Sequence, residues 1–139
     1  MNKTIIILSL LFFLGACGES KTENSAAIDA SAASEKLTLS DGSTLNYVGK
    51  MLYSEDRNNE HGSTRLNKIV IASGAKKVEN LLYTQLLALG YTRKVMDSKE
   101  GTFKVHYYKK GQPTIGAVFL ETAKDDSLTT NMSIYWKTK

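Results

Sequence analysis

The chain has one cysteine, one proline, one tryptophan and two histidines among its 139 residues. A single cysteine excludes a disulfide within the chain, so the stability of the folded part has to come from packing. One cysteine and two histidines also leave few ligands for a zinc site, which needs three or four converging side chains. The sequence therefore does not describe a disulfide scaffold, and it argues against a metal centre.

The sequence also lacks the short motifs that accompany common catalytic and nucleotide-binding sites. It contains no G-x-S-x-G, H-E-x-x-H, P-loop or dinucleotide-binding pattern. No motif places a hydroxyl nucleophile and an orienting carboxylate beside His106, and we interpret His61 as a solvated residue. A loose calcium site remains an alternative there, although the spacing of its oxygen ligands does not match an EF-hand loop; these are Glu55, Asp56, Asn58 and Glu60. We expect no enzymatic activity, no cofactor and no metal.

Long hydrophobic runs are absent except at the N-terminus. The apolar stretch from Ile5 to Phe13 follows Lys3 and precedes Leu14-Gly15-Ala16-Cys17. A membrane-spanning helix needs about 20 apolar residues, so this stretch is too short to cross a bilayer. Its length and positive flank are typical of the hydrophobic region of an export signal.

The residues that end this stretch resemble the lipobox of bacterial lipoproteins. The resemblance implies a signal peptide at residues 1–16, cleavage before Cys17 and acylation of its thiol. Gly18 resembles the class sorted to the outer membrane, so we expect a lipid anchor there that faces the periplasm. In a source with a single membrane, the anchor would lie in the cell membrane. The alternative is an ordinary secretory signal that leaves Cys17 free.

Residues 17–36 are polar and aperiodic. Ser, Ala, Glu and Asn dominate this segment, and Ile28 is its only large apolar side chain after the cysteine. Such a composition buries too little apolar surface to fold alone, so we expect a flexible tether with a span of roughly 24 Å as a coil. Residues 37–139 then form a single periplasmic domain, which holds fifteen Lys or Arg against ten Asp or Glu.

Turn signals and alternating patterns predict strands before the first helical pattern. Asp41-Gly42 lies between two alternating segments of residues 37–48, which predicts a β-hairpin. We expect residues 51–53 to extend its second strand, residues 54–65 to form a polar loop and residues 66–72 to form another strand.

Residues 75–89 show the period of an amphipathic helix, with apolar positions recurring at spacings of three and four. These positions are Val78, Leu81, Leu82, Leu86 and Leu89. Ser73 is the expected N-cap and Gly90 the expected C′ residue. Lys76 and Lys77 lie in the first turn, against the helix dipole, which indicates either plain solvent exposure or an acidic partner at that end.

After the helix the apolar period changes to two, in four segments separated by short turns. Short turns predict antiparallel neighbours. Residues 115–120 are apolar on both faces, so we expect a central strand that is buried on both sides. In the last segment, Leu128, Met132, Ile134 and Trp136 are expected to face inward together with Thr130.

This order of hairpin, strand, helix and four-strand meander predicts an α+β domain in which one amphipathic helix packs on a curved antiparallel sheet. A strand, a helix and a meander resemble the cystatin-like topology. The inhibitory Gln-x-Val-x-Gly loop of true cystatins is absent, so the resemblance implies the fold alone.

Basic and aromatic side chains concentrate around one predicted hairpin, and we take them as a candidate binding surface. They are Tyr91, Arg93, Lys104, His106, Tyr108, Lys109 and Lys110. Such residues together can stack on rings and pair with carboxylates or phosphates. The alternative is that Tyr107 belongs to the core and that the lysines are solubilising charges at strand edges.

These observations favour a non-enzymatic protein-binding module of the cell envelope. The expected partners are the membrane, through the lipid on Cys17, and another envelope or exported protein, with no nucleic acid. The main alternative is an inhibitor or immunity protein against an exported hydrolase or toxin, which would insert residues 54–65 and the Gln112-Pro113 turn. A third hypothesis is a carrier of an apolar ligand, which requires an apolar cavity beside the helix.

Overall fold

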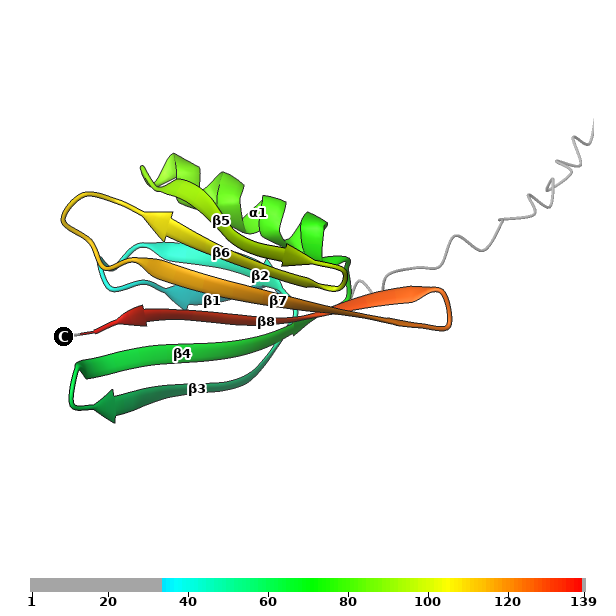
Figure 1. Cartoon of the computed structure of the whole chain (residues 1–139), viewed down its shortest axis with the longest axis horizontal. Helices are drawn as coiled ribbons and strands as arrows, with labels where there is room; N and C mark the ends of the chain where they lie inside the picture. The colour runs from blue at the N-terminus through cyan, green and yellow to red at the C-terminus, as the bar shows by residue number, and fades with distance from the viewer. Residues whose placement is uncertain (1–33, 139) are drawn as a thin grey trace, which may run out of the picture.

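The computed structural model describes residues 34–138, which form eight strands and one helix (Figure 1). The elements are β1 (Ser34–Thr38), β2 (Thr44–Val48), β3 (Lys50–Asn59), β4 (Gly62–Ile71), α1 (Ala75–Ala88), β5 (Thr92–Lys99), β6 (Thr102–Tyr108), β7 (Ile115–Lys124) and β8 (Ser127–Lys137). This arrangement confirms the predicted α+β class. The expected signal peptide, Cys17 and residues 18–33 of the expected tether lie outside the described residues.

Six strands form one antiparallel sheet in the order β3-β4-β8-β7-β6-β5. Strands β5 to β8 are the predicted meander, and its last strand returns to pair with β4, which precedes the helix (Figure 1). The hairpin β1–β2 is a separate two-stranded sheet. This hairpin and α1 pack on the same face of the large sheet, because Leu45, Val78 and Ile134 share one buried core.

The opposite face of the large sheet is open within the described part of the chain. Its side chains, among them Lys68, Val118, Ser133 and Tyr135, are only partly buried. The prediction that β7 is central is confirmed, because β6 and β8 flank it. The prediction that both of its faces are buried is wrong, since Leu120 on the open face is 43% exposed.

The segment from residue 50 to residue 65 departs most from the sequence-based prediction. Instead of a strand extension and a polar loop, it forms β3, the turn at Glu60-His61 and the start of β4. Strand β3 pairs with β4 alone, so it is an edge strand, and nearly all of its side chains are exposed. The Arg57 side chain on this strand, for example, is 63% exposed. Polar, charged residues suit an exposed edge because they discourage pairing with another chain.

Strand β1 already includes Ser34, three residues before the expected domain boundary at Leu37. Residues 34–36 pair with residues 46–48 of β2. The Tyr47 hydroxyl also donates a hydrogen bond to Glu35, with 2.5 Å between the oxygens. These three residues therefore belong to the hairpin rather than to the tether, although their polar side chains are exposed.

Helix α1 spans Ala75–Ala88, close to the predicted range, and Gly90 ends it with a φ of +88° as expected. The prediction that Ser73 is the N-cap is wrong. Gly74 takes that position and offers no side-chain cap. Instead, Glu121 on β7 accepts a hydrogen bond from the Ala75 amide at 2.7 Å. A carboxylate at this helix end also interacts favourably with the helix dipole.

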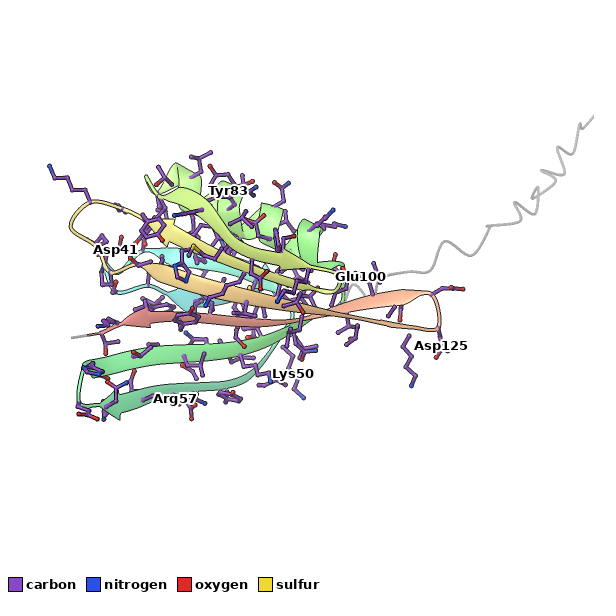
Figure 2. The ribbon with its side chains drawn as sticks, in the orientation of Figure 1. Asp41, Lys50, Arg57, Tyr83, Glu100 and Asp125 are labelled. Carbon is purple, nitrogen blue, oxygen red and sulfur yellow. The ribbon has the colours of Figure 1, made fainter. Side chains whose placement is uncertain are left out.

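Fewer of the apolar helix residues are buried than the sequence predicted. Val78, Leu82 and Leu86 are buried, whereas Leu81 is 58% exposed. In β8, Met132, Ile134 and Trp136 are buried as expected, as is Thr130. Leu128 is exposed, contrary to prediction, because the β7–β8 hairpin projects past the other strands toward the tip that carries Asp125 (Figure 2).

Candidate functional site

The seven residues of the candidate binding surface do not form one surface. Tyr91 is fully buried and therefore cannot take part. Burial raises the pKa of its hydroxyl, and the hydroxyl has no hydrogen-bond partner among the described residues. Lys109 lies over the Tyr91 ring at 5.3 Å and donates to Asp41 at 3.2 Å, while Lys110 is exposed in the turn after β6.

Arg93 faces the helix and not the open side of the sheet. Its guanidinium lies 2.8 Å from a carboxylate oxygen of Glu79, a buried residue of α1. The Tyr107 hydroxyl donates to the other oxygen at 3.0 Å, and both burial and the Glu79 charge raise the pKa of this tyrosine. Tyr107 is a core residue, as the alternative interpretation proposed. These contacts fasten α1 to β5 and β6, so Arg93 has a structural role.

Lys104, His106 and Tyr108 do share the open face of the sheet. The His106 Nδ1 lies 3.3 Å from the Tyr108 hydroxyl, and its Nε2 lies 3.5 Å from the hydroxyl of Tyr135 on β8. Partial burial, followed by the charges of Lys104 and Lys94, lowers the pKa of His106. These surroundings favour the neutral imidazole over the imidazolium.

A glycine inside a predicted strand, Gly116, is a sequence signal for this histidine–tyrosine cluster that was not recognised from the sequence alone. Gly116 on β7 lies between His106 and Tyr135 in the sheet register. A Cβ atom on Gly116 would lie 2.3 Å from the Tyr135 ring, so the ring can cross β7 only above a glycine. A glycine inside a strand often marks such a close approach.

Neither histidine has a carboxylate hydrogen-bond partner among the described residues. His106 contacts two tyrosine hydroxyls, and the His61 amide donates to the Asn59 side chain in the exposed β3–β4 turn. Within residues 34–138, no group of three or more His, Cys, Asp or Glu side chains converges as metal ligands. Nor is any helix in that range long and apolar enough to cross a membrane.

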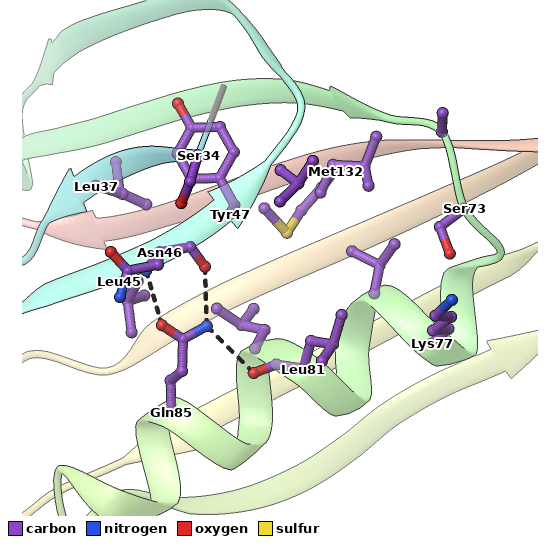
Figure 3. A pocket seen from close by; sticks show the side chains of 15 residues that line it. Ser34, Leu37, Leu45, Asn46, Tyr47, Ser73, Lys77, Leu81, Gln85 and Met132 are labelled. Atoms are coloured by element: carbon purple, nitrogen blue, oxygen red, sulfur yellow. Dashed lines mark hydrogen bonds between the residues drawn. The ribbon is translucent and has the colours of Figure 1, made fainter. Parts of the chain in front are cut away.

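A groove of about 330 Å³ lies between the β1–β2 hairpin and the first half of α1, and sequence reasoning did not predict it (Figure 3). Met132, Val78 and Leu82 come from the core and line it. Leu81 and Val48 line it too, and they are 58% and 52% exposed. The lining is almost entirely apolar.

Among residues 34–138, Lys77 is the only charged residue that lines this groove. It lies with Ser73, Ile71 and Ala72 around the end of the groove that is next to the N-terminus of α1. Lys76, its neighbour in the first turn, is not among the lining residues. The groove therefore combines an apolar surface with one positive charge at one end.

One wall of the groove is the outer edge of β2. The Asn46 amide donates to the Gln85 side-chain oxygen at 2.7 Å, and the Gln85 side-chain nitrogen donates to the Asn46 carbonyl at 2.9 Å (Figure 3). The amide of Gln85 thus pairs with the backbone of β2 as a peptide group of a neighbouring strand would. Within the described residues, β2 pairs with β1 alone, and α1 lies beside its outer edge, where Gln85 bonds to Asn46.

No family model matches the chain, and none of the curated proteins matches its sequence. Among solved structures, the crystal structure of CalU16 from Micromonospora echinospora is similar at 8% sequence identity, with a TM-score of 0.46. The match covers 67% of this chain and 73% of that chain. Likeness at this level carries no argument about function.

Proposed function

We propose that the chain is a lipid-anchored protein of the bacterial cell envelope whose folded domain binds another protein without catalysing a reaction. The lipobox-like residues before Cys17 support the anchor. Acylation of Cys17 would hold the protein on the outer membrane, facing the periplasm. One acyl chain gives marginal membrane binding, so a lasting anchor requires the several chains that lipoproteins carry.

The apolar groove is the observation that carries the binding function. An apolar surface on an exported protein in water is unfavourable unless a partner covers it, and surfaces of this kind mark interaction sites. Leu81 and Val48 stand on opposite sides of the groove, each about half exposed. The side chains around them, such as Lys77 and Gln85, give the groove a polar rim like that of other protein interfaces.

Two measurements test the two halves of this proposal separately. Mass spectrometry of the membrane-extracted protein should find diacylglycerol on Cys17, and a Cys17→Ser variant should move to the soluble fraction. An unmodified Cys17 in the native protein would overturn the anchor.

Photo-crosslinking tests the binding surface. A photoreactive residue at position 81 should capture one partner protein in the envelope. The same residue at position 120, equally apolar but on the open sheet face, should not. Equal capture at both positions, or capture at position 120 alone, would overturn the role of the groove.

The groove also favours a second candidate function, the carriage of a small apolar molecule. Its volume of about 330 Å³ is at the lower end of the range of ligand pockets, roughly 300–1,000 Å³. Organic extraction of the native protein followed by mass spectrometry separates the candidates. A carrier would release one apolar compound in stoichiometric amount, whereas the protein-binding module would release none.

A further inference from the structure

A second pocket, of about 380 Å³, lies on the open face of the large sheet. It shares no lining residue with the apolar groove. Strands β4, β6, β7 and β8 contribute to it, together with the loop before β7. We call it the tyrosine pocket, and its lining includes Thr64, His106, Thr114, Gly116, Tyr135 and Lys137.

The ring of Tyr135 supplies an aromatic surface in this pocket. It crosses β7 at Gly116, where a Cβ atom would lie 2.3 Å from the ring carbon Cζ. One side of the ring therefore rests on the backbone of Gly116, which is buried, while Tyr135 itself is only partly buried. The face of an aromatic ring is negative, so it attracts the weakly positive carbon-bound hydrogens of a sugar ring.

The polar groups around this ring can both donate and accept hydrogen bonds. They are the hydroxyls of Thr64, Thr114 and Tyr135 and the imidazole of His106, whose neutral form is favoured. Sugar hydroxyls donate and accept in the same way. A phosphate group mainly accepts and is bound best by several cations, but Lys137 is the only Lys or Arg among the described residues that line the pocket. The lining therefore suits a sugar better than a bare anion.

Lysines lie on both sides of Tyr135 on the open face. In the sheet register, Lys104, Val118, Ser133 and Lys68 form one row across four strands. Ser133 precedes Tyr135 by two residues on β8, whereas Lys137 follows it by two. The row of Lys104 and the position of Lys137 are thus about 13 Å apart along the strand, with the Tyr135 ring between them.

The positive charge on this face is not compensated within the described part of the chain. No ion pair there holds Lys68, Lys104 or Lys137. The register also places two acidic residues on this face, Glu55 and Asp97, but both already pair with basic neighbours on their own strands. Lysines in such a setting attract anionic ligands.

We propose that the tyrosine pocket binds a polysaccharide that carries carboxylates. One sugar stacks on the Tyr135 ring and bonds to His106, and carboxylates of neighbouring sugars pair with Lys137 and Lys104. Because the two lysine positions are separated by more than one sugar ring, the ligand is a chain of several sugars. This pocket is separate from the apolar groove, so the proposal goes beyond the proposed function and does not rest on it.

Titration calorimetry on the full chain, held in nanodiscs of uncharged phosphatidylcholine, tests the proposal. The acidic probes are a hyaluronan tetrasaccharide and tetragalacturonate, and the neutral control is chitotetraose. At least one acidic probe should bind saturably. Chitotetraose should bind about fivefold or more weakly, because it can stack but has no carboxylates. Neither hexaglutamate nor tripolyphosphate, at the same concentration, should displace the bound probe.

Variants of the protein sharpen the test. Tyr135→Leu should bind the acidic probe about fivefold or more weakly, whereas Tyr135→Phe keeps the ring and should keep most of the affinity. Lys137→Gln should weaken binding of the acidic probe without changing that of chitotetraose. Lys124→Gln, at the exposed tip of the β7–β8 hairpin, is the matched control and should bind as the native chain does. Thermal unfolding checks that each variant is folded.

The proposal is overturned if neither acidic tetrasaccharide binds, if chitotetraose binds as tightly, or if folded Tyr135→Leu binds as the native chain does. Displacement by tripolyphosphate would indicate a simple anion site, and displacement by hexaglutamate an acidic protein partner. Either displacement also overturns the proposal. None of these results changes the proposed function, because photo-crosslinking at position 81 tests the apolar groove separately.

Discussion

Glu79 is the residue through which α1, β5 and β6 are held together by polar contacts. Glu79 is 3% exposed. One of its carboxylate oxygens accepts a hydrogen bond from the Arg93 guanidinium, and the other accepts one from the Tyr107 hydroxyl. Burial of a charge is favourable only when partners of this kind compensate it. Arg93 also stacks over Tyr83 at 5.0 Å, so its position depends on the same cluster.

We expect Glu79→Ala to lower the free energy of unfolding by about 2 kcal/mol. The change leaves the Tyr107 hydroxyl unpaired in the core, and Arg93, partly exposed, loses its ion pair at a smaller cost. Urea denaturation measures the loss. Glu100→Ala, in the exposed β5–β6 turn, is the matched control and should change stability by less than about 0.5 kcal/mol. Equal effects of the two changes would refute the role of Glu79.

Gly116 and Tyr135 should be energetically coupled. Gly116→Ala places a methyl group inside the Tyr135 ring position, and forcing the ring aside should cost about 1–3 kcal/mol of stability. In the Tyr135→Ala background the same change should cost almost nothing. A double-mutant cycle measured by denaturation would thus give a coupling of at least about 1 kcal/mol. Additive effects would contradict this packing.

His106 should titrate below its ordinary pKa of 6.5. Its partial burial and the charges of Lys104 and Lys94 disfavour the imidazolium in the folded state. Below pH 6.5 the folded chain therefore binds fewer protons at this group than the unfolded chain does. As a result, the free energy of unfolding decreases as the pH falls from 6.5 toward the lowered pKa of His106. NMR titration of the imidazole protons measures the pKa, and Lys104→Gln should raise it. A native pKa at or above 6.5 would contradict the account.

At the scale of elements, the N-terminus of α1 depends on a residue far away in the sequence. Glu121 supplies the cap that Gly74 cannot provide, and its charge offsets the unfavourable placement of Lys76 and Lys77 in the first turn. We expect Glu121→Ala to lower stability by about 1 kcal/mol, with Glu121→Gln losing less because an acceptor oxygen remains. Thermal unfolding compares the two variants, and an unchanged melting temperature for Glu121→Ala would contradict this capping.

The elements that the sequence predicted well are those with one buried face. The hairpin around Asp41-Gly42, the helix and the meander all show apolar residues at the period of their structure. Strand β3 was missed because neither of its faces is buried, so residues 54–59 show no apolar alternation. The strand at residues 34–36 was missed for the same reason. The predicted N-cap was wrong because the carboxylate that caps the helix, on Glu121, is 46 residues away from Ala75 in the sequence.

At the scale of the whole molecule, the groove could not be predicted because it forms only where separate parts of the chain meet. In the sequence, Leu81 has the spacing of a core-facing helix residue, and Val48 lies at the end of a hairpin strand. Their shared exposure on facing walls appears only when α1 and the β1–β2 hairpin pack side by side on the sheet. The candidate surface of basic and aromatic residues failed for the converse reason, since β5 and β6 direct its members to opposite faces.

The proposed function requires that the partner protein binds in this groove. The most direct test compares partner recovery from solubilised envelopes by the native chain, Leu81→Asp and Leu120→Asp. Both changes put a charge at a half-exposed leucine, so both should be tolerated by the fold. We expect Leu81→Asp to recover at most one tenth of the partner, and Leu120→Asp to recover as much as the native chain. Undiminished recovery by Leu81→Asp would contradict the proposed function.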